Sequence, residues 1–195
     1  MRICTLGFSL VELIVTLTIA ALLVAMGLPG MSNLVRDYRS SSAINAIVGQ
    51  IQLARSAAIT SGATVTLCPT GGVDLTDPPT CGGRDTWHQG SMLFIDRNRN
   101  GRFSAQDTLL LRFPPISGNG VISWRAFQNR SSLSILSSGL TNSQNGSFRY
   151  CPNNNDPRYA RQAIVNRQAR VRHARDSDGD GLREIPGGQA ISCPR

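Results

Sequence analysis

The chain has 195 residues, a length that fits one membrane helix plus one globular domain and excludes an array of domains. Its net charge is +8, and all 20 basic residues are arginine, because the sequence contains no lysine. Arginine makes bidentate contacts with phosphate, but a lysine-free chain indicates a bias in base composition, so the charge alone is weak support for nucleic-acid binding.

The N-terminus combines a short leader with a long apolar segment. Residues 1–7 precede a run from Phe8 to Leu28, which holds about 21 residues, or ~31 Å of helix. This length matches the ~30 Å hydrocarbon core of a bilayer, so we expect residues 8–29 to form a transmembrane helix. The competing interpretation is an ordinary secretory signal peptide cleaved near residues 25–30, which leaves an acidic residue unexplained inside the apolar run.

That acidic residue is Glu12. An ionised carboxylate at bilayer depth costs roughly 2.5–3.5 kcal/mol, so Glu12 needs a specific partner. Cleavage after Gly7 would free an α-amino group on Phe8, and the amino group of one copy could neutralise Glu12 of its neighbour. The arrangement predicts that the leader is cleaved, that the protein spans a membrane before assembly, and that many copies then assemble.

A second helical pattern follows Pro29, which removes a backbone hydrogen bond and should bend the helix. Its apolar residues recur at helical spacing and should form one core-facing stripe. The stripe comprises Ile44, Ile47, Val48, Ile51, Ala54 and Ala58. Gly62 is a suitable C-terminal stop, so we expect one long bent helix over residues 8–61. Its second half would belong to a globular domain that spans residues 30–195.

After Gly62 the sequence changes to short β-type runs separated by Gly, Pro, Asn and Ser. The predicted strands are Ala63–Cys68, Ser91–Ile95, Thr108–Phe113, Val121–Phe127, Leu133–Leu136, Ser147–Cys151, Gln162–Asn166 and Arg170–Ala174. A long helix on one or more antiparallel sheets is an α+β fold. We expect Trp87, Phe94, Phe113, Trp124 and Phe148 to fill the core between helix and sheet.

The sequence has five cysteines, and Cys4 lies in the leader. The remaining four favour two disulfides in a chain exported across a membrane. Three pairings are open. Proximity favours Cys68–Cys81 and, by remainder, Cys151–Cys193, which would fasten the C-terminal tail.

The segment Leu6-Gly7-Phe8-Ser-Leu-Val-Glu12 resembles the processing site of type IV pilins and type II secretion pseudopilins. In that superfamily a prepilin peptidase cuts after the glycine and methylates the new N-terminal phenylalanine. The resemblance implies that Gly7 precedes the cut, that Phe8 becomes the methylated N-terminus, and that Glu12 acts in assembly.

Several globular segments resemble the GspH/FimT family of minor pilins and pseudopilins. They are Ala54–Ile59, Val65–Pro69, Trp87–Gly101, Ala160–Val165 and Arg170–Arg172. The resemblance implies a type IV pilin-like fold and a structural subunit, without a cofactor, in type IV pilus assembly and biogenesis. Its partners would be the prepilin peptidase and other major and minor pilins. The protein would first lie in the bacterial inner membrane as a single-pass protein with a periplasmic domain, and would then enter the fibre.

Two alternatives stay open. A minor pseudopilin of a type II secretion system would help to export folded proteins, and a pilus-borne DNA receptor would serve natural transformation. No nucleophile motif lies near His88 or His173, and no phosphate-binding glycine loop occurs, so we do not expect an enzyme.

Two stretches have oxygen ligands at calcium-loop spacing. In Asp96–Asp107 the neighbouring arginines oppose a cation, which favours a turn held by Asp and Asn side chains. Asp176, Asp178, Asp180 and Glu184 are the stronger candidate ligands for Ca²⁺, but Gly187 stands where a closing carboxylate is usual, which favours a solvated acidic turn.

Six arginines and no acid lie between Arg158 and Arg175. Strand alternation places Arg170 and Arg172 on one face, where some FimT-type proteins carry a DNA-contacting basic motif. Those proteins normally have a glycine before the first arginine, and this chain has Ala169. The alternative is a solvated strand face, which the lysine-free composition favours because it raises arginine content everywhere.

Overall fold

The computed structural model describes residues 9–71, 79–118 and 120–193, and it describes residues 26–30 by their backbone alone. The predicted leader and the predicted cleavage site at Gly7 and Phe8 lie outside these residues. The chain divides into two compact units, Met1–Tyr38 and Arg39–Arg195.

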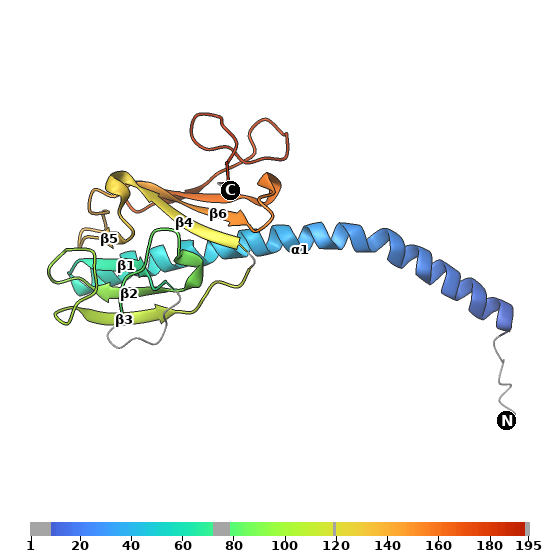
Figure 1. Cartoon of the computed structure of the whole chain (residues 1–195), viewed down its shortest axis with the longest axis horizontal. Helices are drawn as coiled ribbons and strands as arrows, with labels where there is room; N and C mark the ends of the chain where they lie inside the picture. The colour runs from blue at the N-terminus through green and yellow to red at the C-terminus, as the bar shows by residue number, and fades with distance from the viewer. Residues whose placement is uncertain (1–8, 72–78, 119, 194–195) are drawn as a thin grey trace, which may run out of the picture. The chain divides into compact units, whose positions relative to one another are not determined.

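One helix, α1 (Leu10–Ser61), runs through both units (Figure 1). It begins after Ser9, whose carbonyl accepts a hydrogen bond from Leu13 N at 3.2 Å. The helix continues through Pro29 and ends before Gly62, whose φ of +63° suits a residue without a Cβ. These limits agree with the predicted helix over residues 8–61.

The described residues of the second unit form eight strands and three short 3-10 helices. The strands are β1 (Val65–Pro69), β2 (Ser91–Ile95), β3 (Thr108–Phe113), β4 (Gly120–Ala126), β5 (Leu133–Ile135), β6 (Gly146–Pro152), β7 (Arg161–Val165) and β8 (Val171–His173). The short helices are η1 (Trp87–Gln89), η2 (Phe127–Asn129) and η3 (Pro157–Tyr159). The predicted strand Val121–Phe127 ends early because Phe127 begins η2.

The strands form two antiparallel four-stranded sheets, with the orders β3-β2-β1-β5 and β4-β6-β7-β8. Together with α1 they confirm the predicted α+β, pilin-like fold, in which a long N-terminal helix packs on antiparallel sheets.

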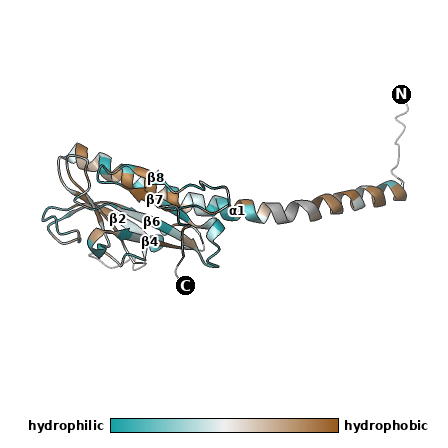
Figure 2. Cartoon of the chain, turned by 90° about the horizontal axis from the view of Figure 1, so that it is seen from above, coloured by the Kyte–Doolittle hydropathy of each residue, from teal (hydrophilic) through white to brown (hydrophobic). Residues whose placement is uncertain are grey.

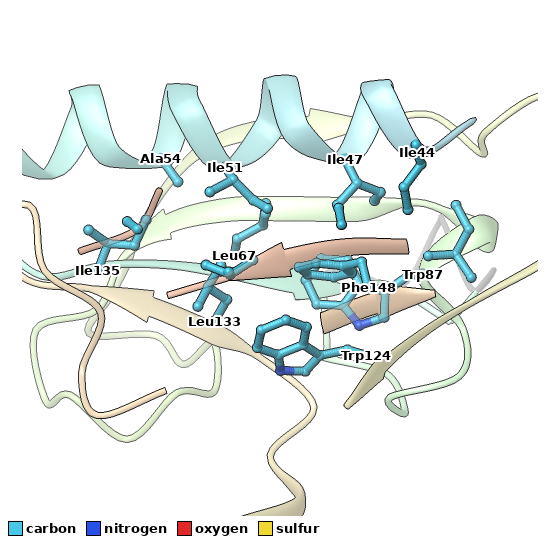
Figure 3. Close-up of a cluster of buried hydrophobic side chains, with 14 of the residues drawn as sticks. Ile44, Ile47, Ile51, Ala54, Leu67, Trp87, Trp124, Leu133, Ile135 and Phe148 are labelled. Carbon is cyan, nitrogen blue, oxygen red and sulfur yellow. The ribbon is translucent and has the colours of Figure 1, made fainter. Parts of the chain in front are cut away.

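The main core lies between α1 and the sheets (Figure 3). The predicted stripe faces it: Ile44, Ile47, Ile51, Ala54 and Ala58 are fully or almost fully buried, and Val48 is partly buried. Three aromatic rings fill the space below the helix. Phe148 meets Trp87 edge-on, with ring centroids 4.7 Å apart, and stacks on Trp124 at 4.3 Å.

Phe94 corrects one core prediction. It is completely buried, but it packs with Cys68 and Met92 in a second, smaller cluster, separate from the helix-facing core. Its neighbour Leu93 points into the main core, because successive strand residues point to opposite faces. The ring of Phe103 covers Phe94 at a centroid distance of 5.3 Å. Phe113 also departs from the prediction, because it only borders the main core.

Two disulfides join Cys68 to Cys81 and Cys151 to Cys193. The first ties β1 to the segment before η1, and the second ties β6 to the C-terminal tail, residues 175–193. Ile191 of the tail is buried against Ala160 and Ala174, so the tail has a small core of its own.

Candidate functional site

The first unit presents an apolar surface along α1, drawn largely in brown in Figure 2. Between residues 10 and 24 its large apolar side chains are 49–74% exposed. They are Leu10, Val11, Leu13, Ile14, Val15, Leu17, Ile19, Leu22, Leu23 and Val24. A continuous apolar surface of this extent is typical of a segment that is buried by lipid or by other subunits.

Glu12 lies in the first turn of this segment and is exposed. Its backbone N donates a hydrogen bond to the Oγ of Ser9 at 3.2 Å. The Ser-x-x-Glu spacing is that of a capping box, in which the acid also stabilises the positive end of the helix dipole. This second role of Glu12 was not predicted, although the Ser-x-x-Glu signal is present in the sequence.

The predicted membrane span includes Phe8 and the side chains of residues 26–30, which lie outside the description. Within the described residues, none of the helices combines the length and the apolar character that a membrane crossing requires.

The acidic stretch of the tail brings the four predicted metal ligands together. One carboxylate oxygen from each of Asp176, Asp178, Asp180 and Glu184 lies within 4.8 Å of the others. The three aspartates are exposed and Glu184 is partly buried. Oxygen atoms at this spacing can surround one hard cation such as Ca²⁺.

Backbone amides also hold this loop. The Asp176 carboxylate accepts hydrogen bonds from Gly179 N at 2.7 Å and Gly181 N at 2.9 Å. The Oε2 of Glu184 accepts one from Ser177 N at 2.7 Å, while its buried Oε1 accepts none from any described residue. The carboxylates therefore shape the turn, and a carboxylate that accepts one such bond still has lone pairs for a cation.

The Asp96–Asp107 loop has the predicted turn chemistry. Asp96 is 1% exposed, and its carboxylate accepts hydrogen bonds from Thr66 Oγ1, Gly101 N and Asn100 N at 2.9, 2.9 and 3.2 Å. Asp107 accepts a further bond from Arg97 N at 2.9 Å. Asp96 thus joins the loop to β1, which is a structural role.

The arginine cluster of residues 158–175 divides into buried and exposed members. Arg161 is 4% exposed and donates to the carbonyls of Ala160 and Arg158 at 2.8 and 2.9 Å and to Ser41 Oγ at 3.4 Å. Arg158 forms a bidentate pair with Asp156. These two arginines are therefore engaged within the protein, whereas Arg167, Arg170, Arg172 and Arg175 are exposed.

The two predicted DNA contacts lie near the start of β8. Arg170 precedes this strand, and its backbone N donates to Asn166 Oδ1 at 2.9 Å. Arg172 lies on the strand opposite Ile164. The residue before Arg170 is Ala169, which has a φ of +54° and is completely buried. The left-handed conformation explains physically why a glycine suits this position.

Arg172 and Glu184 line the same pocket, which has a volume of about 440 Å³ and is bordered by the Gly187–Gly188 turn. The structure thus brings one predicted DNA contact and one predicted metal ligand together, which the sequence did not indicate. His88 is partly buried, and its Nδ1 accepts a hydrogen bond from Ile122 N at 3.4 Å. Burial lowers the pKa of His88 below its ordinary value.

Comparison with known proteins adds a family match. A family model described as "Type II transport protein GspH" matches residues 43–169. This range contains Cys68, Cys81, Cys151 and most of the core, but it excludes Glu12 and the acidic tail. No curated protein matches the chain.

Two solved structures match the chain, and the fold similarity rests on the first of them. The type IV minor pilin FimU of Pseudomonas aeruginosa is 16% identical and has a TM-score of 0.50, covering 68% of this chain and 85% of FimU. The minor pseudopilin EpsH of the type 2 secretion system of Vibrio cholerae is 12% identical and has a TM-score of 0.45, covering 66% of this chain and 90% of EpsH.

Proposed function

The chain belongs to the GspH family of minor pilins and pseudopilins, and we propose that it is a minor subunit of a type IV pilus. A prepilin peptidase would cut between Gly7 and Phe8 and methylate Phe8. The subunit would wait in the inner membrane with its second unit in the periplasm, and then enter the fibre beside other pilins.

The observation that carries this proposal is the contrast between the two parts of α1. In the second unit the helix buries its apolar stripe against the sheets. In the first unit large apolar side chains are exposed on all sides of the helix. A helix that is apolar all round needs a fully apolar environment, which lipid supplies before assembly and neighbouring helices supply afterwards.

The carboxylate of Glu12 requires a positively charged partner within this apolar surface. Its carboxylate is the single acidic group between Ser9 and Arg36, so it remains uncompensated within that segment. An N-terminal amino group on the Phe8 of an adjacent subunit would neutralise it, which couples proteolytic processing to assembly.

The experiment that separates pilus from secretion is deletion of the gene from the producing bacterium, with complementation. We expect surface pili to be lost while secretion of folded proteins continues. Retained pili together with lost secretion would contradict the proposal and support a pseudopilin of a type II secretion system.

Two secondary proposals concern the second unit. The exposed arginines Arg170 and Arg172 favour a weak, salt-dependent contact with DNA. The convergence of four carboxylates within 4.8 Å favours Ca²⁺ in the tail loop. Both are independent of the structural role in the fibre.

A further inference from the structure

The β4-β6-β7-β8 sheet has one face against the main core and an outer face that points away from it. Trp124 of β4 enters the main core, and because side chains alternate along a strand, Arg125 lies on the outer face. Arg125 is opposite Ser147, Ser147 is opposite Ile164, and Ile164 is opposite Arg172. These four residues form one row across the outer face, with an arginine at each end, about 14 Å apart at ~4.8 Å per strand.

The outer face carries an excess of positive charge around Arg125. Burial lowers the pKa of the neighbouring Arg149, and the charge of Arg125 lowers it further. Asp85 pairs with Arg125 at 3.8 Å and with Arg84 at 3.6 Å, so two arginines share one carboxylate. Both pairs are solvent-exposed and contribute little. Arg125 can therefore exchange Asp85 for another anion.

An exposed aromatic ring follows β4. Phe127 is 66% exposed, and it begins η2, in which Gln128 and Asn129 have φ angles of +63° and +52°. The left-handed backbone disfavours a residue such as Gln128, which has a Cβ. The turn is held because Arg84 Nη1 donates a hydrogen bond to Asn129 Oδ1 at 2.8 Å. The fold thus keeps Phe127 in solvent at a conformational cost.

Phe127 adjoins a pocket of the second unit. Its backbone N donates a hydrogen bond to the carbonyl of Asn145 at 3.4 Å, and Asn145 lines a pocket of about 530 Å³. Ser147, the register partner of Arg125, also lines this pocket, as does the exposed Arg167. The lining residues in the described part of the chain include no acid. An aromatic ring and two accessible cations therefore surround one concave surface.

This arrangement selects among polyanions. Guanidinium groups bind phosphate through paired hydrogen bonds, and an exposed aromatic ring binds a nucleobase by stacking. In a duplex the bases stack on one another and expose only their edges in the grooves, so a ring such as that of Phe127 can stack only on an unpaired base. An acidic peptide would pair with the arginines but would leave the exposed ring unused.

We propose that the outer face binds single-stranded nucleic acid, with a base stacked on Phe127 and adjoining phosphates paired with Arg125 and Arg167. This inference rests on the DNA contact proposed above for Arg170 and Arg172. It adds the form of nucleic acid that is bound and the residues that select this form.

The first test compares two forms of one ligand by fluorescence anisotropy, with the full chain in a zwitterionic detergent. The ligands are an oligothymidylate of about 16 nucleotides and its duplex with oligoadenylate. We expect the single strand to bind at least about tenfold more tightly than the duplex at equal salt. Phe127→Ala should weaken single-strand binding at least about fivefold and leave duplex binding unchanged. Tyr38→Ala removes an exposed aromatic ring of the first unit, and it should change neither.

The second test separates stacking from charge. Arg125→Gln should reduce the slope of log K against log salt by about 0.7 for the single strand, whereas Phe127→Ala should leave the slope unchanged because the ring carries no charge. Phe127→Trp should retain binding, and the single strand should quench its added fluorescence. The natural Trp87 and Trp124 are completely buried, so they should not respond. Binding that Phe127→Ala loses and Phe127→Trp keeps is due to the ring and not to the fold.

The results that would overturn the proposal also distinguish it from the DNA contact on which it rests. Equal affinity for the two forms, or an unchanged single-strand affinity in Phe127→Ala, would overturn this inference and leave the contact at Arg170 and Arg172 standing. An absence of binding to either form at roughly 0.1 mM protein would overturn both. Displacement of the single strand by polyglutamate at equal charge concentration would overturn the inference in favour of an acidic protein partner.

Discussion

The Oγ of Ser9 accepts a hydrogen bond from the backbone N of Glu12 at 3.2 Å, and this contact marks the start of α1. Glu12 therefore has two separable roles. It stabilises the first turn of the helix locally, and by our proposal it pairs with the N-terminus of a neighbouring subunit. Only the second role requires the negative charge to be matched across a subunit boundary.

Replacing Glu12 should separate these roles. Glu12→Gln keeps a side chain that suits a capping box but removes the charge, and Glu12→Ala removes both. We expect both variants to insert in the membrane and to enter sheared fibres much less than the wild type, measured by immunoblotting. Ser9→Ala, which weakens only the cap, should assemble almost normally; normal assembly of Glu12→Gln would contradict the pairing.

Calcium should bind to the tail loop with an affinity typical of extracellular sites, with a Kd of about 10⁻⁴–10⁻³ M. Titration calorimetry should give heat for the wild type and none for the Asp176→Asn, Asp180→Asn double variant. Asp85→Asn changes an exposed acid that pairs with Arg84 and Arg125 instead, so it should retain the heat. An absence of heat with the wild type at millimolar Ca²⁺ would exclude the metal.

Arg170 and Arg172 should contribute to DNA binding through phosphate. The Arg170→Gln, Arg172→Gln double variant should weaken a gel shift of the full chain and reduce the slope of log K against log salt by about two. Arg97→Gln with Arg99→Gln removes the same charge from another exposed loop and serves as the control. Identical shifts for wild type and Arg170/Arg172 variant would dismiss this site.

Stability should fall in mild acid because of His88. Burial lowers the pKa of His88 below 6.5 in the folded chain, so the unfolded chain takes up the proton first. This contribution to the free energy of unfolding is complete above pH 6.5 and is lost as the pH falls toward the lower, folded pKa.

Chemical denaturation between about pH 7 and pH 5 checks this prediction. His88→Gln should show a smaller loss of stability than the wild type over that range, because it has no proton to take up. Parallel curves for the two proteins would show that His88 does not carry the effect.

The disulfide between Cys151 and Cys193 should stabilise the second unit. The two residues are 42 positions apart, so replacing both by serine should lower the free energy of unfolding by about 2–4 kcal/mol. Denaturation followed by tryptophan fluorescence measures the loss. Adding a reductant to the wild type should give at least as large a loss; an unchanged midpoint in the serine variant would contradict the prediction.

Local sequence patterns predicted the elements well because periodicity is a local property. β2 and β3 begin and end at the predicted residues, and α1 ends where Gly62 indicated. Other strand limits differ from the prediction by one or two residues: β1 begins at Val65 and not at Ala63, and β4 ends at Ala126 and not at Phe127. At Phe127 the strand is followed by η2, with positive φ angles at Gln128 and Asn129 that neither residue type predicts as a glycine would.

The segments that pack against each face of a strand could not be predicted from local patterns. Phe94 was expected in the core between helix and sheet, but in the folded chain it packs in a separate cluster under the ring of Phe103. Arg161 appeared to be one member of a solvated arginine run, yet carbonyl groups and Ser41 bury it beside α1. Such contacts depend on segments far apart in the sequence.

The candidate sites also differ in whether their residues are close together or far apart in the sequence. The spacing of Asp176, Asp178 and Asp180 predicted a convergent loop, because all its members are close in sequence. The pocket that Arg172 and Glu184 share could not be predicted, because it forms only where the Gly187–Gly188 turn of the tail lies near β8.

The measurement that most directly tests the central claim is the mass of the N-terminal peptide of the protein purified from its own fibres or membranes. The account predicts a chain that begins at Phe8 and carries an N-methyl group. A chain that begins at Met1, or after a cut near residues 25–30, would contradict it, because Glu12 would then have no such partner or would be absent.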